Sequence, residues 1–113
     1  IDYEDRLNIF DTQILCRFYR DLYTWEELEK ILHMVTGMPS SPEDLRKIAS
    51  SIADMTRQFN LREGLQPKDD RLPERLHTEA LPSGETISTE DMDHLLNDYY
   101  KLRGWDSQGI PAK

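Results

Sequence analysis

The sequence contains little cysteine and few apolar residues. These shortages exclude an internal disulfide bond and argue against a membrane span. Among 113 residues there are one cysteine and five glycines, 37% of the residues are apolar, and the mean hydropathy is −0.73. A single cysteine excludes an internal disulfide bond and favours a reducing compartment. No apolar run approaches the ~20 residues that a transmembrane helix needs, so we expect no membrane span.

Basic charge is scarce as well. The chain has 14 Lys and Arg against 22 Asp and Glu, which gives a net charge of −8. Nucleic acids and anionic membrane surfaces are bound through clustered Lys and Arg, and the sequence has no such cluster. We therefore expect neither nucleic acid nor membrane among its partners. The chain begins at Ile1 without a signal-peptide pattern, and we expect it to be a piece of a longer protein.

Three stretches have the apolar spacing of α-helices, at residues 25–35, 42–61 and 89–102. In each stretch an apolar residue recurs every third or fourth position, which gives the helix one apolar face. Hydroxyl residues precede the three stretches and glycines follow them, as helix caps do: Thr24, Ser41 and Ser88 at the starts, and Gly37, Gly64 and Gly104 beyond the ends.

The remaining segments are less regular. The first twenty residues predict one or two short helices broken near Asp11. The connector between Gly64 and Ser88 contains three prolines and one short helical candidate at 73–76. No alternation typical of β-strands is sustained. The predicted fold is all-α: a small helical domain with three main helices, short N-terminal helical turns and a long proline-containing connector.

Cys16 is the residue for which the sequence leaves the most chemical roles open. A lone cysteine is either a small buried hydrophobic residue, a nucleophile or a metal ligand. The three histidines show no metal-site spacing, and no histidine is tied to Cys16 by spacing. An iron–sulfur cluster normally takes four cysteines, so the other ligands would lie outside this chain. The residues alone predict an acidic helical domain with one thiol and no complete active site.

Three segments together resemble tungsten-containing aldehyde ferredoxin oxidoreductases. Residues 10–18, FDTQILCRF, resemble the family's Asp-x-x-Gly-Leu-Cys segment. Residues 57–64, RQFNLREG, followed by DDRLPER at 69–75, resemble a mid-domain stretch. Residues 99–106, YYKLRGWD, followed by GIP at 109–111, resemble the end of the family pattern. The three occur in the family's order and cover most of the chain.

The resemblance implies that residues 1–113 are the C-terminal helical domain of a larger oxidoreductase. Such an enzyme oxidises a small aldehyde to a carboxylic acid and passes electrons to ferredoxin. It carries a tungsten (or molybdenum) bis-pterin and a [4Fe–4S] cluster, both shared with the remaining domains of the parent. The resemblance also implies a cytoplasmic location. We expect no catalytic residue in this chain, and no activity from it alone.

The resemblance assigns roles to three residues. Cys16 matches the fourth cluster ligand, whose three companions lie in another domain. Asp11 matches a carboxylate that hydrogen-bonds a pterin ring, and Leu15 matches a residue whose backbone faces the pterin. The chain departs from the pattern at Ile14, where the family has glycine, and a β-branched residue there needs a different backbone path.

Further expectations follow for the rest of the chain. Without its cofactors and partner domain, the segment from Asp11 to Phe18 should expose apolar surface. Arginines and aspartates of the matched segments could form an ion-pair network that holds the connector: Arg57, Arg62, Arg75, Asp69 and Asp70.

Two alternatives stay open. The parent could be a relative with another substrate, such as an aromatic acyl-thioester reductase. The chain could instead be a non-catalytic acidic interaction module in which Cys16 is merely buried.

Overall fold

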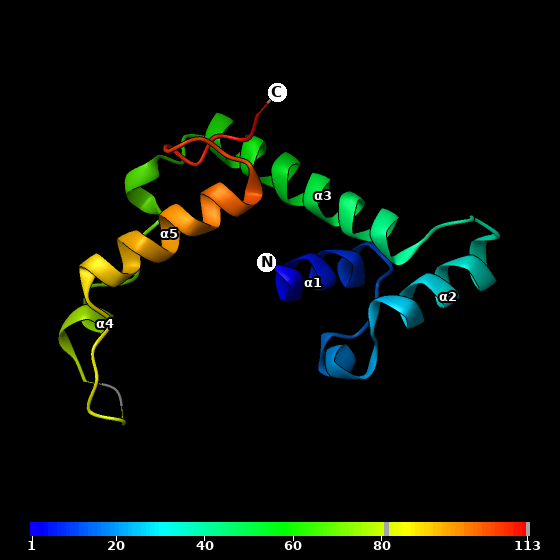
Figure 1. The fold of residues 1–113 in the computed structure, drawn as a ribbon, viewed down its shortest axis with the longest axis horizontal. Coiled ribbons are helices and arrows are strands. Elements are labelled where there is room, and N and C mark those ends of the chain that lie inside the picture. Colours follow the sequence, from blue (N-terminus) through cyan, green and yellow to red (C-terminus); the bar gives the residue numbers. More distant parts are fainter. Residues whose placement is uncertain (81, 113) are drawn as a thin grey trace. The chain divides into compact units, whose positions relative to one another are not determined.

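The structure is a computed structural model that describes residues 1–80 and 82–112 (Figure 1). Within them the chain forms helices and no strand; the one bridge, an isolated pair, joins Trp105 to Pro111. The helices are α1 (Asp2–Thr12), the 3₁₀ helix η1 (Arg17–Leu22), α2 (Trp25–Thr36), α3 (Pro42–Arg62), the 3₁₀ helix η2 (Pro67–Asp69), α4 (Arg75–Thr78) and α5 (Thr89–Arg103). The all-α prediction is confirmed.

The three main helices begin where their predicted caps place them. The Thr24 side chain accepts from the Glu27 N–H, and the Glu27 side chain accepts from the Thr24 N–H, which completes a capping box at the start of α2. The Ser88 hydroxyl accepts from the Asp91 N–H at the start of α5. The helical candidate at 73–76 overlaps α4, because the carbonyl of Pro73 already accepts the first bond of that turn.

The first helix is longer than the short turns that the sequence predicted. α1 has 11 residues, continues through Asp11 and ends at Thr12. Three acidic residues lie in its first turn, where they interact favourably with the positive end of the helix dipole: Asp2, Glu4 and Asp5. The break in the chain therefore falls just after Asp11.

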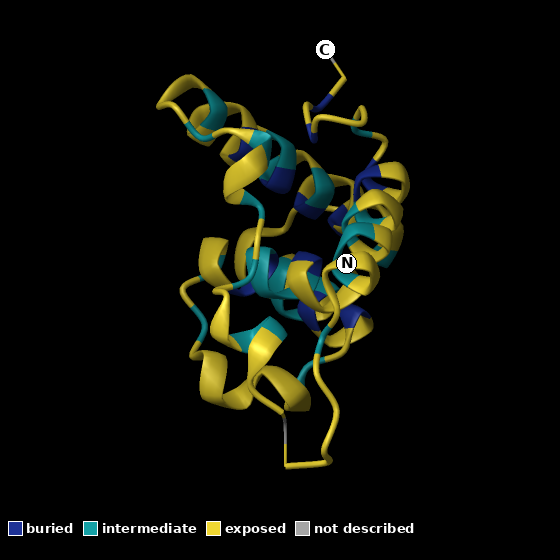
Figure 2. Ribbon diagram, turned by 90° about the vertical axis from the view of Figure 1, so that its left-hand side faces the viewer, coloured by how far each residue is buried: buried dark blue, intermediate teal, exposed yellow. Residues whose placement is uncertain are grey.

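The chain divides into two compact units, Ile1–Thr56 and Arg57–Lys113, and α3 contributes to both. The core of the first unit is formed by α1, α2 and the first half of α3, together with the segment before α2. Its buried members are Ile9, Phe10, Trp25, Leu28, Leu45 and Ala49. Figure 2 shows the buried positions as short stretches, most of them on helices, and most of the rest of the ribbon as exposed.

In the second unit, a buried arginine organises the residues around it. The Arg57 guanidinium donates from Nε to the Gly109 carbonyl at 2.8 Å and from Nη1 to Asp70 Oδ1 at 2.8 Å. Its Nη2 pairs with the other oxygen of Asp70, which also accepts from the Tyr100 hydroxyl. Hydrogen bonding to Arg57 lowers the pKa of Asp70, while burial and the bond to Asp70 raise the pKa of Tyr100 to about 12.

The ion-pair network predicted for the connector is wrong in its extent, because only Arg57 and Asp70 pair as expected. Arg62 and Arg75 instead pair with acids on their own turns, Glu63 and Glu79. The Asp69 carboxylate accepts from the Gln66 N–H at the start of η2. Side chains close in sequence reach one another at a smaller entropic cost than a long-range network requires.

Four helices end with a residue of positive φ after the last turn. After α2, α3 and α5 that residue is a glycine: Gly37 with φ 71°, Gly64 with φ 104° and Gly104 with φ 72°. After α1 it is Ile14, with φ 57°, the one non-glycine residue with positive φ in the described chain. For an L-residue this conformation costs roughly 1–2 kcal/mol.

None of the helices among the described residues is long and apolar enough to cross a membrane.

We predict that Ile14→Gly stabilises the chain. Relief of the left-handed strain outweighs the ~0.5–1 kcal/mol entropic cost of a glycine, for a net gain of up to about 1.5 kcal/mol. Little packing is lost, because Ile14 is 92% exposed. Urea denaturation of both proteins measures the change. Gly104→Ala is the matched opposite and should destabilise by about 1 kcal/mol. An unchanged or lower stability of Ile14→Gly contradicts the prediction.

We predict that Tyr100 makes the protein sensitive to alkali. Its pKa is about 12 in the folded chain and has an ordinary value of 10.0, so the neutral phenol is favoured by folding. The corresponding stability is complete below pH 10 and is lost as the pH rises toward 12. Unfolding free energies of wild type and Tyr100→Phe, measured from pH 8 to 12, should therefore converge with rising pH. A constant difference across this range would refute the assignment.

Candidate functional site

The candidate site is the turn that follows α1, and its backbone hydrogen bonds set its shape. The Ile14 N–H donates to the Asp11 carbonyl at 3.1 Å, and the Leu15 N–H donates to the Phe10 carbonyl at 2.9 Å. These are the two bonds of a Schellman motif, which satisfies carbonyls left open at a helix end. Leu15 packs against the core of the first unit, whereas Ile14 and Cys16 are exposed.

Cys16 lies immediately after this turn, at the N-cap position of η1. Its carbonyl accepts from the Tyr19 N–H at 3.0 Å, and its thiol is free and exposed. The reading of Cys16 as a small buried hydrophobic residue is therefore wrong. An exposed, unbonded thiol is what a metal ligand supplied to another domain requires.

The described residues contain no group of three or more His, Cys, Asp or Glu placed to hold a metal ion. A cluster bound at Cys16 would accordingly take its remaining ligands from outside the described residues. The donor set fits that arrangement, since Cys16 offers one sulfur and a [4Fe–4S] cluster normally takes four cysteines.

Asp11 is the last acidic residue of α1, and Arg17 holds its carboxylate. Arg17 Nε donates to Asp11 Oδ1 at 2.9 Å, and Arg17 Nη2 donates to Oδ2. This bonding lowers the pKa of Asp11, so the group is a carboxylate at neutral pH. The side chain is 51% exposed and has further lone pairs, so it can accept hydrogen bonds from a ligand. Asp11 fits a role as acceptor for a pterin edge.

The Leu15 backbone has its carbonyl, but not its N–H, available for a ligand. Its N–H is already bonded to the Phe10 carbonyl. A backbone contact from Leu15 to a pterin would therefore use its carbonyl as the acceptor. The Leu15 side chain is committed to the core, which fixes the backbone on either side of it.

Exposed apolar side chains lie on both sides of Cys16 in the sequence. Ile14 and Phe18 are each 92% exposed, and Tyr19 and Leu22 are also exposed. The exposed apolar surface expected between Asp11 and Phe18 is confirmed. Several large exposed apolar side chains in one short segment are typical of a surface that a partner covers.

Behind the turn lies a hollow of about 350 Å³ between the end of α1 and α2. Seven residues line it: Thr12, Gln13, Leu15, Ile31, Leu32, Val35 and Thr36. The Gln13 Oε1 atom is buried and has no hydrogen-bond partner among the described residues. The walls of the hollow are mostly apolar, and the hollow adjoins the turn that carries Cys16.

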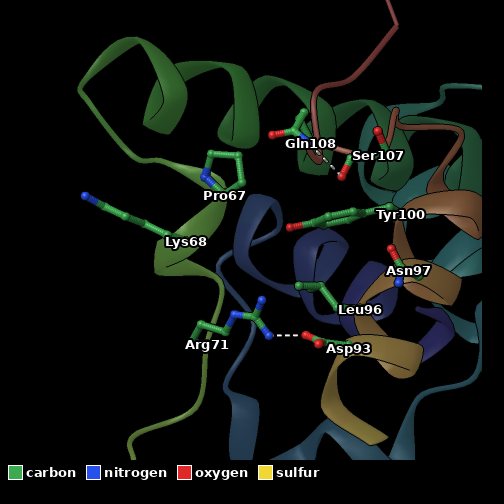
Figure 3. Close-up of a pocket in the computed structure, with 9 residues that line it drawn as sticks. All are labelled: Pro67, Lys68, Arg71, Asp93, Leu96, Asn97, Tyr100, Ser107 and Gln108. Atoms are coloured by element: carbon green, nitrogen blue, oxygen red, sulfur yellow. Dashed lines mark hydrogen bonds and ion pairs between the residues drawn. The ribbon is translucent and has the colours of Figure 1, made fainter. Parts of the chain in front are cut away.

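A second hollow, of about 420 Å³, lies in the second unit and is polar (Figure 3). Residues of α5 face Pro67, Lys68 and Arg71 across it, and Arg71 is paired with Asp93. None of Asp11, Leu15 and Cys16 lines this hollow. None of the three histidines lines this hollow. The His77 ring is hydrogen-bonded to the Ile87 carbonyl, and the His33 ring to the Met38 carbonyl.

The structure thus brings Asp11, Leu15 and Cys16 onto one turn and adds Arg17, which the sequence analysis did not single out. The available signal was the position of Arg17 directly after the cysteine and six residues after Asp11. Arg17 reaches Asp11 only because the turn folds the chain back on itself.

Comparison with known proteins identifies relatives along the whole chain. Residues 1–113 match the family described as aldehyde ferredoxin oxidoreductase, domains 2 and 3. The tungsten-containing aldehyde ferredoxin oxidoreductases of Pyrococcus furiosus and Pyrococcus abyssi are 34% and 35% identical over 114 residues. Each alignment covers 98% of this chain and 19% of the relative.

A solved structure of a differently named enzyme also resembles the chain. The chain superposes on the active-site complex BamBC of benzoyl coenzyme A reductase, determined with 1,5-dienoyl-CoA, with a TM-score of 0.79 and 26% identity. The match covers 99% of this chain and 17% of that one. The chain thus spans about a fifth of the length of the relatives it matches.

Because the family model matches residues 1–113 and relatives are 34% and 35% identical, the chain belongs to the aldehyde ferredoxin oxidoreductase family.

Proposed function

We propose that the parent enzyme oxidises an aldehyde to a carboxylic acid and that this chain is its C-terminal helical domain. In this reaction an aldehyde and a water molecule give the acid, two protons and two electrons, and two ferredoxins each accept one electron. The relatives at about 34% identity, which are named for this activity, support the proposal. A cytoplasmic location belongs to the same proposal.

The observation that carries the proposal for this chain is the exposed thiol of Cys16 on a turn that also exposes the Asp11 carboxylate. When bound, a tungsten (or molybdenum) bis-pterin supplies two-electron chemistry, and a [4Fe–4S] cluster supplies single-electron transfer. Cys16 would lose its proton and bind one iron of the cluster through its thiolate, completing the set of ligands from the other domains.

Asp11 and Leu15 would contact the pterin. A carboxylate accepts two donors at once, which suits the guanidine-like edge of a pterin. The Leu15 carbonyl, four residues further along the chain, would accept a further donor. The Schellman turn fixes the backbone that carries both residues before a ligand arrives.

The apolar surface around Cys16 would be covered by the remaining domains of the parent. Covering Ile14, Phe18 and Leu22 would remove exposed apolar area and exclude water from the thiolate side of the cluster. The alternative of a free interaction module with a buried Cys16 loses its premise, because the thiol is exposed.

A second substrate class has one observation in its favour, which is the superposition on benzoyl coenzyme A reductase. A relative of that enzyme would reduce an aromatic acyl thioester rather than oxidise an aldehyde. The higher identity to the aldehyde oxidoreductases favours the aldehyde.

The substrate prediction is tested with the full-length enzyme, purified without oxygen. Small aldehydes should reduce ferredoxin in a spectrophotometric assay, and reduced ferredoxin with benzoyl-CoA should give no turnover. If the enzyme turns over benzoyl-CoA and does not oxidise aldehydes, the proposed reaction is wrong and the enzyme reduces an aromatic acyl thioester instead.

The ligand prediction is tested by Cys16→Ala in the full-length enzyme. Removal of one of four cluster ligands should lower the iron content and abolish or alter the EPR signal of the cluster. Ser51→Ala removes a similarly exposed small polar group elsewhere in the first unit and is the matched control. An unchanged iron content and signal in Cys16→Ala would end the ligand assignment.

A further inference from the structure

The pair of Arg17 and Asp11 is unlike the other surface ion pairs of the first unit. Both oxygens of Asp11 accept from the guanidinium, one from Nε at 2.9 Å and one from Nη2. Three neighbouring pairs are single contacts at 3.7–3.8 Å, formed by Arg20 with Asp21, Arg46 with Asp2, and Lys47 with Asp44. A two-point contact fixes the orientation of the carboxylate, which a single contact does not.

The pair also closes a loop around the cysteine. Asp11 belongs to the last turn of α1 and Arg17 is the first residue of η1, so the ion pair joins the two sides of the turn that presents Cys16. The side chains of Arg17 and Asp11 are 57% and 51% exposed. At such exposure an ion pair adds little to folding stability, and the pair remains accessible to a ligand.

Asp11 keeps acceptor capacity while it is paired. A carboxylate has about four lone-pair sites, and the guanidinium fork uses two of them. Without Arg17, a half-exposed aspartate would sample several rotamers, and a ligand would have to order it on binding. The hydrogen bond to Arg17 lowers the pKa of Asp11 below its ordinary value, so the pairing is compatible with a charged acceptor.

We propose that Arg17 is a positioning residue for the pterin. It holds the Asp11 carboxylate in one orientation, so that this group accepts the N–H edge of a pterin without further ordering. The inference rests on the proposed function, in which Asp11 contacts the pterin. The orientation of the Asp11 carboxylate comes from two hydrogen bonds donated by the planar guanidinium. A lysine cannot reproduce this geometry with its single ammonium group.

The experiment compares four variants of the full-length enzyme: Arg17→Gln, Arg17→Lys, Asp11→Asn and the control Arg20→Gln. Tungsten, pterin and iron are measured per protein after gel filtration. Both Arg17 variants should retain several-fold less tungsten and pterin than wild type, with unchanged iron. Arg20→Gln should retain all three, since the Arg20 guanidinium lies 3.8 Å from its own neighbour Asp21.

A chemical rescue separates positioning from general loss of structure. Arg17→Ala, loaded with cofactor in the presence of millimolar methylguanidinium, should regain pterin, whereas methylammonium should not restore it. Wild-type pterin content in either Arg17→Gln or Arg17→Lys would overturn the inference, as would loss of iron in proportion to pterin or rescue by methylammonium.

Asp11→Asn distinguishes this inference from the proposed function. If Asp11→Asn loses pterin while the Arg17 variants keep it, the positioning role alone is wrong. If Asp11→Asn keeps its pterin, the assignment of Asp11 in the proposed function fails, and the role of Arg17 fails with it.

Discussion

The candidate site depends on one residue in a left-handed conformation. Ile14 turns the chain after α1, and the bonds from Ile14 and Leu15 back to the helix satisfy two carbonyls that would otherwise lack partners. The turn sends the Leu15 side chain into the core and leaves Cys16 on the surface. The family pattern has glycine where this chain has Ile14, yet the turn is retained, because the packing of Leu15 and the two hydrogen bonds offset the strain on the isoleucine.

In the second unit, the residues that match the family pattern are explained by architecture. Gly104 ends α5 with positive φ, and Trp105 packs its ring 6.0 Å from that of Tyr100. The Asp106 carboxylate accepts from the N–H groups of Gln108 and Ile110 and closes the next turn. A side chain at Gly109 would place its Cβ 2.6 Å from Arg57 and Tyr100, so only glycine lets the chain pass there. These residues fix the last segment of the chain, and the candidate chemistry lies elsewhere.

Helix caps and apolar spacing predicted the positions of the main helices well. They did not predict which side chains from different segments pair. Helices 25–35, 42–61 and 89–102 were each predicted to within one residue, because caps such as Thr24 and Gly37 act through neighbours a few residues away. The connector network failed for the opposite reason, since the sequence does not show which of several carboxylates an arginine will reach. Arg62 found Glu63 beside it, and Arg71, which was not predicted to pair, reached Asp93 on α5. Arg17 was missed in the same way.

The sequence by itself determined the helical class, the helix ends, the family resemblance and the identity of the one available thiol. These depend on composition, on short-range spacing and on motifs that are contiguous in the chain. The tertiary structure alone decided that Cys16 is exposed rather than buried, that Ile14 adopts the left-handed turn, and that Arg17 holds Asp11. Exposure and pairing depend on which surfaces of the folded chain meet, and that information is spread over α1, α2 and α3 instead of residing in any one segment.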